Sequence, residues 1–172
     1  MKKILLVILL LCSTTAFSQN TVIIPTPQIN ELMDGCFILK EPFLFVCDDT
    51  NPDVQKIVND FKFEMKDMLG NKIVLSEKVK RKYPAVVFEI VDDIGVDKFE
   101  EQAYILDVAE NVITLKATHC QGLFYATRSL KQIVRYAVME SDIPAIQCQH
   151  IVDWPDLEYR GWMDDISRGP VP

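Results

Sequence analysis

The sequence predicts an α+β domain in which a mainly antiparallel sheet carries two helices on one face. Two observations lead to this fold class. Short apolar runs rich in branched residues are separated by turn-forming stretches, which is typical of strands. Two longer segments repeat their apolar residues every three or four positions, the spacing of an amphipathic helix. The 172 residues contain no internal repeat or long linker, so we expect one domain over residues 19–152.

The apolar runs define the expected strands in chain order. They lie at residues 21–24, 37–39, 43–46, 73–75, 85–90, 103–108, 112–117 and 145–152. Pro25 ends the first of them, because proline cannot donate a hydrogen bond to a sheet. Glu110 and Asn111 separate the strands at 103–108 and 112–117, so a tight antiparallel hairpin is the expected connection.

Two helices are expected between these strands. Asn51 is a good capping residue, and Pro52 suits the first helical position. The apolar pattern of this first helix continues to Leu69, after which Gly70 ends it. The second helix is expected over residues 121–138, where the apolar residues again fall on one face.

The N-terminus has the three parts of a secretory signal peptide. Two lysines are followed by an apolar run at 4–11 and by small polar residues from Ser13. The run is shorter than the roughly 20 residues that a membrane-spanning helix needs. We expect cleavage after Ser18 and export to the periplasm or beyond the cell. Cys12 offers a competing lipoprotein anchor, although Leu11 precedes it where a lipobox normally has a small residue.

The charge of the chain excludes one class of partner. Removing residues 1–18 takes away two lysines and no acidic residue, so the formal net charge falls from −7 to −9. Nucleic-acid binding depends on clustered Lys and Arg, so an acidic chain of this kind is not expected to bind nucleic acid. A neutral or polar small substrate fits the composition better.

Four cysteines remain after position 18, and export would expose them to an oxidising compartment. Up to two disulfides could then form, in any of three pairings, and buried free thiols are the alternative. The wide spacing contains no CxxC motif, which argues against a zinc or redox site. The four are Cys36, Cys47, Cys120 and Cys148.

A charged, strand-like segment follows the break at 153–155. It runs Tyr159-Arg160-Gly161-Trp162-Met163-Asp164-Asp165-Ile166-Ser167-Arg168 and resembles the motif that opens the catalytic barrel of the family 20 glycoside hydrolases, the β-N-acetylhexosaminidases. Upstream, the segment Gln121-Gly122-Leu123-Phe124-Tyr125-Ala126-Thr127-Arg128-Ser129-Leu130-Lys131-Gln132 resembles the long helix of the accessory domain that precedes the barrel. The resemblance implies that 19–152 is that accessory domain and that 153–172 begins a (β/α)₈ barrel whose remainder, out of about 250 residues, lies outside this chain.

The resemblance assigns a substrate-binding role to Arg160. The arginine of the family's Arg-Gly step hydrogen-bonds hydroxyl groups of the terminal sugar, and a guanidinium offers a rigid fork of donors for two adjacent hydroxyls. The alternative is that Arg160 only pairs with a nearby acid, Asp156 or Glu158. Asp165 and Arg168 match the family's later Asp and Arg, and we expect them to hold the strand end and its loop, with a simple structural ion pair as the alternative.

The residues that carry out hydrolysis in this family are an adjacent Asp-Glu pair, and this chain contains no Asp-Glu dipeptide. We therefore expect no catalytic residue here. The acidic pairs at 48–49 and 92–93 are expected to be solvated in turns. His119 and His150 lack a spaced partner and are expected to pack at strand edges, and no metal or other cofactor is implied. Trp154 and Trp162 are expected to be buried at the junction, with a sugar-stacking platform as the alternative.

The resemblance implies the activity of the full-length protein. It would remove terminal β-linked N-acetylhexosamine from glycans by substrate-assisted retaining hydrolysis, in which the substrate's own acetamido group replaces an enzyme nucleophile. The fragment itself would be inactive. The alternative is a non-catalytic secreted domain that binds carbohydrate or protein, because a fold does not by itself imply an activity. A continuation of the reading frame that contains an Asp-Glu pair would distinguish the two.

Overall fold

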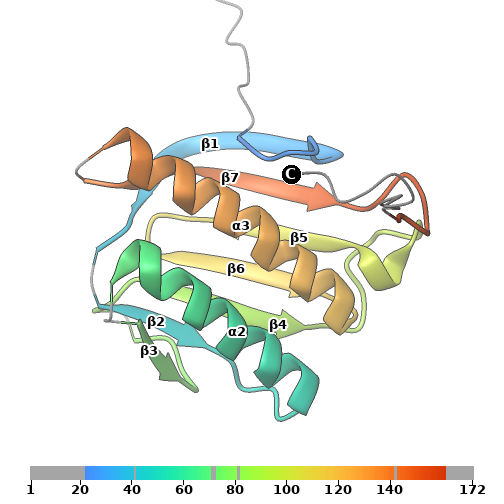
Figure 1. The fold of residues 1–172 in the computed structure, drawn as a ribbon, viewed down its shortest axis with the longest axis horizontal. Helices are drawn as coiled ribbons and strands as arrows, with labels where there is room; N and C mark the ends of the chain where they lie inside the picture. The colour runs from blue at the N-terminus through green and yellow to red at the C-terminus, as the bar shows by residue number, and fades with distance from the viewer. Residues whose placement is uncertain (1–21, 41, 71–72, 81, 142, 162–172) are drawn as a thin grey trace, which may run out of the picture.

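The computed structural model describes residues 22–40, 42–70, 73–80, 82–141 and 143–161. In these residues a seven-stranded sheet of order β1-β7-β5-β6-β4-β2-β3 carries two helices on one face (Figure 1). The strands are β1 (Ile29–Ile38), β2 (Phe43–Val46), β3 (Ile73–Ser76), β4 (Ala85–Ile90), β5 (Tyr104–Val108), β6 (Val112–Ala117) and β7 (Ala145–Asp153). The helices are α2 (Pro52–Leu69) and α3 (Cys120–Glu140), and a short 3₁₀ helix, η1 (Glu100–Gln102), precedes β5.

The sheet is mixed, which corrects the prediction of a mainly antiparallel sheet. The β1–β7, β7–β5 and β5–β6 pairs are antiparallel, and the β6–β4, β4–β2 and β2–β3 pairs are parallel. The physical reason lies in the connections. Helix α2 joins β2 to its neighbour β3, and a crossover helix between neighbouring strands makes them parallel. The sequence predicted a tight hairpin only between the strands now named β5 and β6, and that pair is antiparallel. It also predicted a turn at 40–42 between the strands at 37–39 and 43–46, but β1 and β2 are not neighbours in the sheet.

Both predicted helices form, and α2 begins and ends where it was expected. The side chain of Asn51 accepts a hydrogen bond from the Asp53 amide at 2.9 Å, and Gly70 ends α2 with a positive φ of 79°. These are the capping and stopping roles that the sequence indicated. Helix α3 extends from Cys120 to Glu140, slightly beyond the predicted 121–138 at both ends.

The N-terminal strand predictions were the least accurate. Within the predicted strand at 21–24, the described residues form no strand, and Ile23 and Ile24 lie in a bend. The segment lies against α3, where the side-chain amide of Gln132 accepts from the N–H of Ile24 at 2.9 Å and donates to its carbonyl oxygen at 3.2 Å. The predicted strand at 37–39 is the end of the ten-residue β1. Strand β1 lies at the edge of the sheet (Figure 1). It lacks an apolar pattern because most of its side chains are exposed.

The core lies between the helices and the sheet. The Phe45 ring is 5.6 Å from that of Phe61 on α2 and 5.3 Å from that of Phe88 on β4, so aromatic rings join helix to strands. Further buried core residues are Val54, Val58, Met65, Leu106, Ile113, Leu115, Leu123, Leu130 and Ile151. No helix among the described residues has the length and apolar character needed to cross a membrane.

Helix α3 approaches the sheet closely at Gly122. A Cβ atom on this residue would lie 2.1 Å from the carbonyl oxygen of Ala103, which immediately precedes β5. No side chain fits in that space. The glycine therefore sets how deeply the first turn of α3 sits on the sheet, and this contact positions the face of α3 that lines the candidate site.

Candidate functional site

A pocket of about 460 Å³ lies beside the C-terminal end of β7. Its walls come from four parts of the chain: the N-terminal segment at 23–28, the residues Gln102 and Tyr104 around the start of β5, one side of α3, and the segment at 153–160 that leaves β7. Polar side chains from all four parts line it. The pocket therefore lies where the domain ends and the barrel-like motif begins.

A chain of hydrogen bonds forms the floor of the pocket. The hydroxyl group of Tyr104 on β5 lies 2.5 Å from the Ser129 hydroxyl on α3, and it donates to Oδ2 of Asp153 at 3.1 Å. Tyr104 and Ser129 are buried, at 2% and 6% exposure. Buried polar groups need partners, so this chain of bonds fixes the helix, the sheet and the end of β7 relative to one another.

The electrostatics of the floor follow from burial. Burial raises the pKa of the Asp153 carboxyl group, and hydrogen bonds from the Gln28 amide and the Tyr104 hydroxyl only partly offset the rise. Burial, with the charge of Asp153 beside it, raises the pKa of Tyr104 as well. Tyr104 is therefore a neutral donor at physiological pH.

The polar groups of the pocket mostly bind one another. The Gln28 side-chain amide donates to the carbonyl oxygen of Trp154 at 3.3 Å and to Oδ1 of Asp156 at 3.0 Å. The Gln28 main-chain N–H donates to Oδ1 of Asp153 at 3.2 Å. These bonds join the N-terminal segment to the segment after β7, which are 125 or more positions apart in the sequence.

Arg160 lies at the mouth of this pocket. Its guanidinium donates to Oε1 of Gln102 at 2.9 Å and to the carbonyl oxygen of Leu157 at 3.4 Å, and it lies 5.4 Å from the centre of the Tyr125 ring. Among the described residues it forms no ion pair, so the predicted alternative of pairing with an acid at 156 or 158 is not seen. The guanidinium is exposed, and its role toward a sugar stays a prediction.

Several other predicted residues can be placed. Trp154 is partly buried: it packs against the cluster of Val96, Ala103 and Val152 and also lines the pocket, so the predictions of burial and of sugar stacking both stay open. Asp165, Arg168 and Trp162 lie outside the described residues. No group of three metal-ligating side chains occurs in the part of the chain that the structure describes.

The acidic pairs and the histidines lie away from the pocket. Oδ1 of Asp49 accepts from the Asn51 amide at 2.8 Å, and Oδ1 of Asp93 accepts from the Gly95 amide at 2.6 Å, so these pairs lie in turns as predicted. Nδ1 of His150 on β7 lies 2.5 Å from Oδ1 of Asp107 on β5, its cross-strand neighbour. His119 is the residue immediately before α3.

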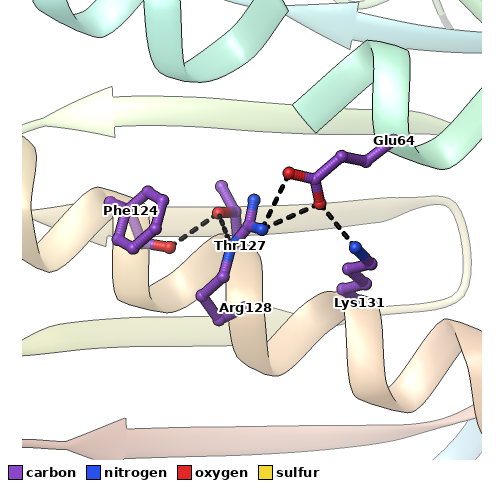
Figure 2. A network of polar contacts seen from close by, with 5 residues as sticks. All are labelled: Glu64, Phe124, Thr127, Arg128 and Lys131. Carbon is purple, nitrogen blue, oxygen red and sulfur yellow. Dashed lines mark hydrogen bonds and ion pairs between the residues drawn. The ribbon is translucent and has the colours of Figure 1, made fainter. Parts of the chain in front are cut away.

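Figure 2 shows a charged network that sequence reasoning missed, between α2 and α3. Glu64 accepts from Arg128 through both oxygens, at 2.9 and 2.8 Å, and from Lys131 at 2.7 Å. Burial works to raise the pKa of Glu64, but the bonds and charges of Lys131 and Arg128 lower it overall. Arg128 also lies 4.7 Å from the Phe124 ring. Two residues of the motif at 121–132, Arg128 and Lys131, therefore join the two helices.

The family of the chain can now be stated. A model of glycosyl hydrolase family 20, domain 2, matches residues 20–154, which include all the strands and both helices described above. The chain belongs to family 20. The match also identifies the region before the barrel-like motif as the family's accessory domain, as the resemblance implied.

Individual family 20 proteins support the match. Beta-hexosaminidase subunit A2 of Dictyostelium discoideum is 22% identical over 170 residues, which are 97% of this chain and 30% of that protein. The chitobiase of Flavobacterium johnsoniae is 23% identical, with a TM-score of 0.65 over 88% of this chain and 23% of that one. The exo beta-N-acetylglucosaminidase of Vibrio harveyi is 21% identical, with a TM-score of 0.63 over 86% and 21%. The chain thus spans less than a third of these proteins.

Proposed function

We propose that this chain is the N-terminal part of an exported β-N-acetylhexosaminidase that removes terminal N-acetylhexosamine from glycans. The observation that carries the proposal is the match to family 20 domain 2 over residues 20–154, directly followed by a segment that resembles the opening of the family's catalytic barrel. The proteins of similar fold include one crystallised with N-acetylglucosamine. The accessory domain would then support the barrel, and the chemistry would lie in the barrel.

The proposed reaction is substrate-assisted. The oxygen of the substrate's acetamido group attacks the anomeric carbon, an oxazolinium intermediate forms, and water opens it with retention of configuration. The Asp-Glu pair that orients the acetamido group and protonates the leaving group lies outside this chain. The present residues would contribute binding rather than proton transfer.

Arg160 is the residue of this chain that would touch the sugar. Its fork of N–H donors suits two adjacent hydroxyl groups, and it keeps its charge at any physiological pH. The proposal requires that the guanidinium exchange its contacts with Gln102 and Tyr125 for sugar hydroxyls once the barrel is complete. Because the side chain is exposed and makes no ion pair with a described residue, this exchange breaks no buried interaction.

Arg160 can be tested in the full-length enzyme. Arg160→Ala should lower kcat/KM by about 10²-fold or more, because each hydrogen bond from a charged donor is worth about 1.5–3 kcal/mol. Arg160→Lys should also be poor, since one ammonium group cannot reproduce the fork. Gln102→Ala is the matched control: it removes the intramolecular partner of Arg160 and should leave kcat/KM near normal.

Two outcomes would contradict this role. One is near-normal kinetics in a stable Arg160→Ala enzyme. The other is an equal loss of activity and melting temperature in Arg160→Ala and Gln102→Ala, which would show that Arg160 only stabilises the junction. Melting curves of all three variants, measured beside the kinetics, separate the two cases.

The proposal also predicts that the 172-residue chain is inactive by itself. It should not hydrolyse a chromogenic N-acetyl-β-glucosaminide above background, because it has no Asp-Glu pair and because one barrel strand cannot build the closed pocket that positions the acetamido group. Clear hydrolysis by this chain would refute that part. Export is tested separately by the intact mass of secreted protein: we expect Gln19 as the first residue, and a diacylglyceryl group on Cys12 would instead show a lipoprotein.

A further inference from the structure

Strands β1 and β7 change register around one buried cysteine. Leu32 pairs with Gln149 and Cys36 pairs with Gln147, so three residues of β1 lie opposite the single residue Cys148. Gly35, which immediately precedes Cys36, adopts a positive φ of 97° within this irregular stretch. The position of a Cβ atom on Gly35 lies only 3.4 Å from Sγ of Cys148. The thiol of Cys148 is therefore directly beside the backbone that leads into Cys36.

The sheet order restricts which cysteines can meet. Cys36 is on β1 and Cys148 on its neighbour β7, whereas Cys47 follows β2, four strand positions from β7. Four strand spacings are about 19 Å, far beyond the roughly 7 Å between Cα atoms that a disulfide allows. Cys47 can therefore reach neither Cys36 nor Cys148. Since two of the three possible complete pairings join Cys47 to one of these residues, only the pairing that contains Cys36–Cys148 remains.

The second disulfide of that pairing, Cys47–Cys120, would not join neighbouring strands. Cys47 follows β2 and Cys120 comes shortly after β6, and β4 lies between these strands. The two strands are about 9.6 Å apart, two spacings. All four cysteines are free thiols in the structure, and Cys47 and Cys120 are each partly buried. Because they follow strands that are not neighbours, Cys47 and Cys120 serve as internal controls.

We propose that Cys36 and Cys148 are a redox-sensitive pair whose disulfide joins the edge strand β1 to β7. The bond would have a clear physical effect, because β1 has a sheet partner on one side only and most of its side chains are exposed. A cross-link between positions 36 and 148 also closes a long loop of the unfolded chain and so reduces its entropy.

The exposures of the two thiols determine which of them reacts first. Cys36 is exposed, whereas Cys148 is 3% exposed. The Cys36 thiolate attacks a small external disulfide, forms a mixed disulfide and releases one thiolate. The Cys148 thiolate then attacks the Cys36 sulfur and releases the second. The two protein thiols are oxidised, the external disulfide is reduced to two thiols, and the protons of the protein thiols pass to them.

The second step should depend on pH. Burial raises the pKa of Cys148, and the neighbouring Cys36 and Glu110 raise it further. Only the thiolate is nucleophilic, so closure of the mixed disulfide should be slow at neutral pH and faster under alkaline conditions.

Oxidised glutathione is the probe for the test. The purified protein, folded and at about pH 8, is incubated with it, its free thiols are blocked with iodoacetamide, and unreduced peptides are mapped by mass spectrometry. We expect a cross-link between the peptides that carry Cys36 and Cys148, the loss of two hydrogen atoms, and a rise in Tm of about 5 °C or more. Cys36→Ser should abolish all three effects, whereas Cys47→Ser and Cys120→Ser should leave them intact.

Two results would overturn the proposal. In one, Cys36 keeps a bound glutathione while Cys148 stays unmodified in protein that melts cooperatively. In the other, the cross-link involves Cys47 or Cys120. Cys148→Ala, which keeps a small apolar side chain at the buried position, separates loss of the bond from loss of the fold.

Discussion

The hydroxyl group of Tyr104 lies 3.1 Å from Oδ2 of Asp153 and joins the start of β5 to the last residue of β7. The two residues are also register partners across the antiparallel pair, so main-chain pairing and side-chain bonding coincide there. Asp153 lies directly before the junction with the barrel-like segment. The bond therefore fixes the point from which the chain leaves the domain.

Asp153 should make the stability of the domain fall as the pH rises. Burial raises its folded-state pKa above the ordinary 3.8. The stabilisation from proton binding is complete below that ordinary value and is lost as the pH rises through the folded-state pKa. We expect Asp153→Asn to flatten the free energy of unfolding over this window, measured by urea denaturation at a series of pH values.

Tyr104→Phe is the matched variant for that experiment. It keeps the ring but removes the hydroxyl group that donates to Asp153, and this bond lowers the Asp153 pKa. The free energy of unfolding should therefore fall more steeply as the pH rises. The loss of a buried hydrogen bond should also destabilise the domain by about 1 kcal/mol. An unchanged slope in both variants would show that another group is responsible.

Gly122→Ala should destabilise the domain, although helix propensity predicts the opposite sign. Alanine in place of an interior helical glycine normally stabilises by about 1 kcal/mol. Here the added Cβ would lie 2.1 Å from the Ala103 carbonyl oxygen, so α3 must move away from the sheet. We expect a net loss of about 2 kcal/mol or more in chemical denaturation. At Gly161 the added Cβ would meet no atom of the described residues within 4 Å, so Gly161→Ala should be close to neutral.

Glu64→Gln should weaken the contact between α2 and α3 and change the acid limb of the stability curve. The cations of Lys131 and Arg128 lower the folded-state pKa of Glu64 below the ordinary 4.5 despite its partial burial. Its stabilisation is therefore present above pH 4.5 and is lost as the pH falls through the folded-state pKa. Near neutral pH we expect a loss of about 1 kcal/mol, since the network is only partly buried.

A surface ion pair on the same helix provides the comparison for Glu64. Lys56 and Asp60 are four residues apart on α2 with side chains that are 73% and 58% exposed. Disrupting that pair with Asp60→Asn should leave the free energy of unfolding near neutral pH almost unchanged, because water screens an ion pair this exposed. If the two variants lost the same stability, the network of Figure 2 would be no more than a surface contact.

Truncation tests the boundary between the domain and the barrel-like segment. A chain ending at Gly161 should melt cooperatively, because it keeps the bonds of Gln28 to Asp153, Trp154 and Asp156. A chain ending at Val152 lacks these acceptors and should melt at a lower temperature, although still cooperatively. Failure of the shorter chain to fold would place the boundary after β7 rather than at 152.

The sequence predicted elements well where the local pattern is strong. The strands at 43–46, 85–90 and 112–117 were placed at their observed ends, because buried strands keep apolar runs between turn residues. Helix α2 was equally clear from its cap and its stop at Gly70. Strand β1 was mostly missed, since exposed edge residues carry no apolar pattern. The parallel half of the sheet was missed because strand order depends on long-range packing.

The candidate site was only partly predictable for a similar reason. Arg160 was identified through its resemblance to a family motif, and the role that this motif implies depends on the complete barrel. The bonds among Tyr104, Ser129 and Asp153 join residues that are 25 and 49 positions apart, so no local spacing could have indicated them. The charge of Asp153 at the end of an apolar strand was the one available signal.

The pairing of β1 with β7 has a consequence for the order in which the domain can be completed. Ile29 pairs with Val152, so the first strand of the described sheet in chain order can find its partner only after the last strand of that sheet has been made. Until then the β1 segment has no sheet neighbour, while β2 to β6 pair with one another and pack against the two helices. Long-range pairing of this kind slows folding. The pairing of β1 with β7 should therefore be the last step of folding. Residues 29–38 should be the last to gain protection from hydrogen exchange during refolding.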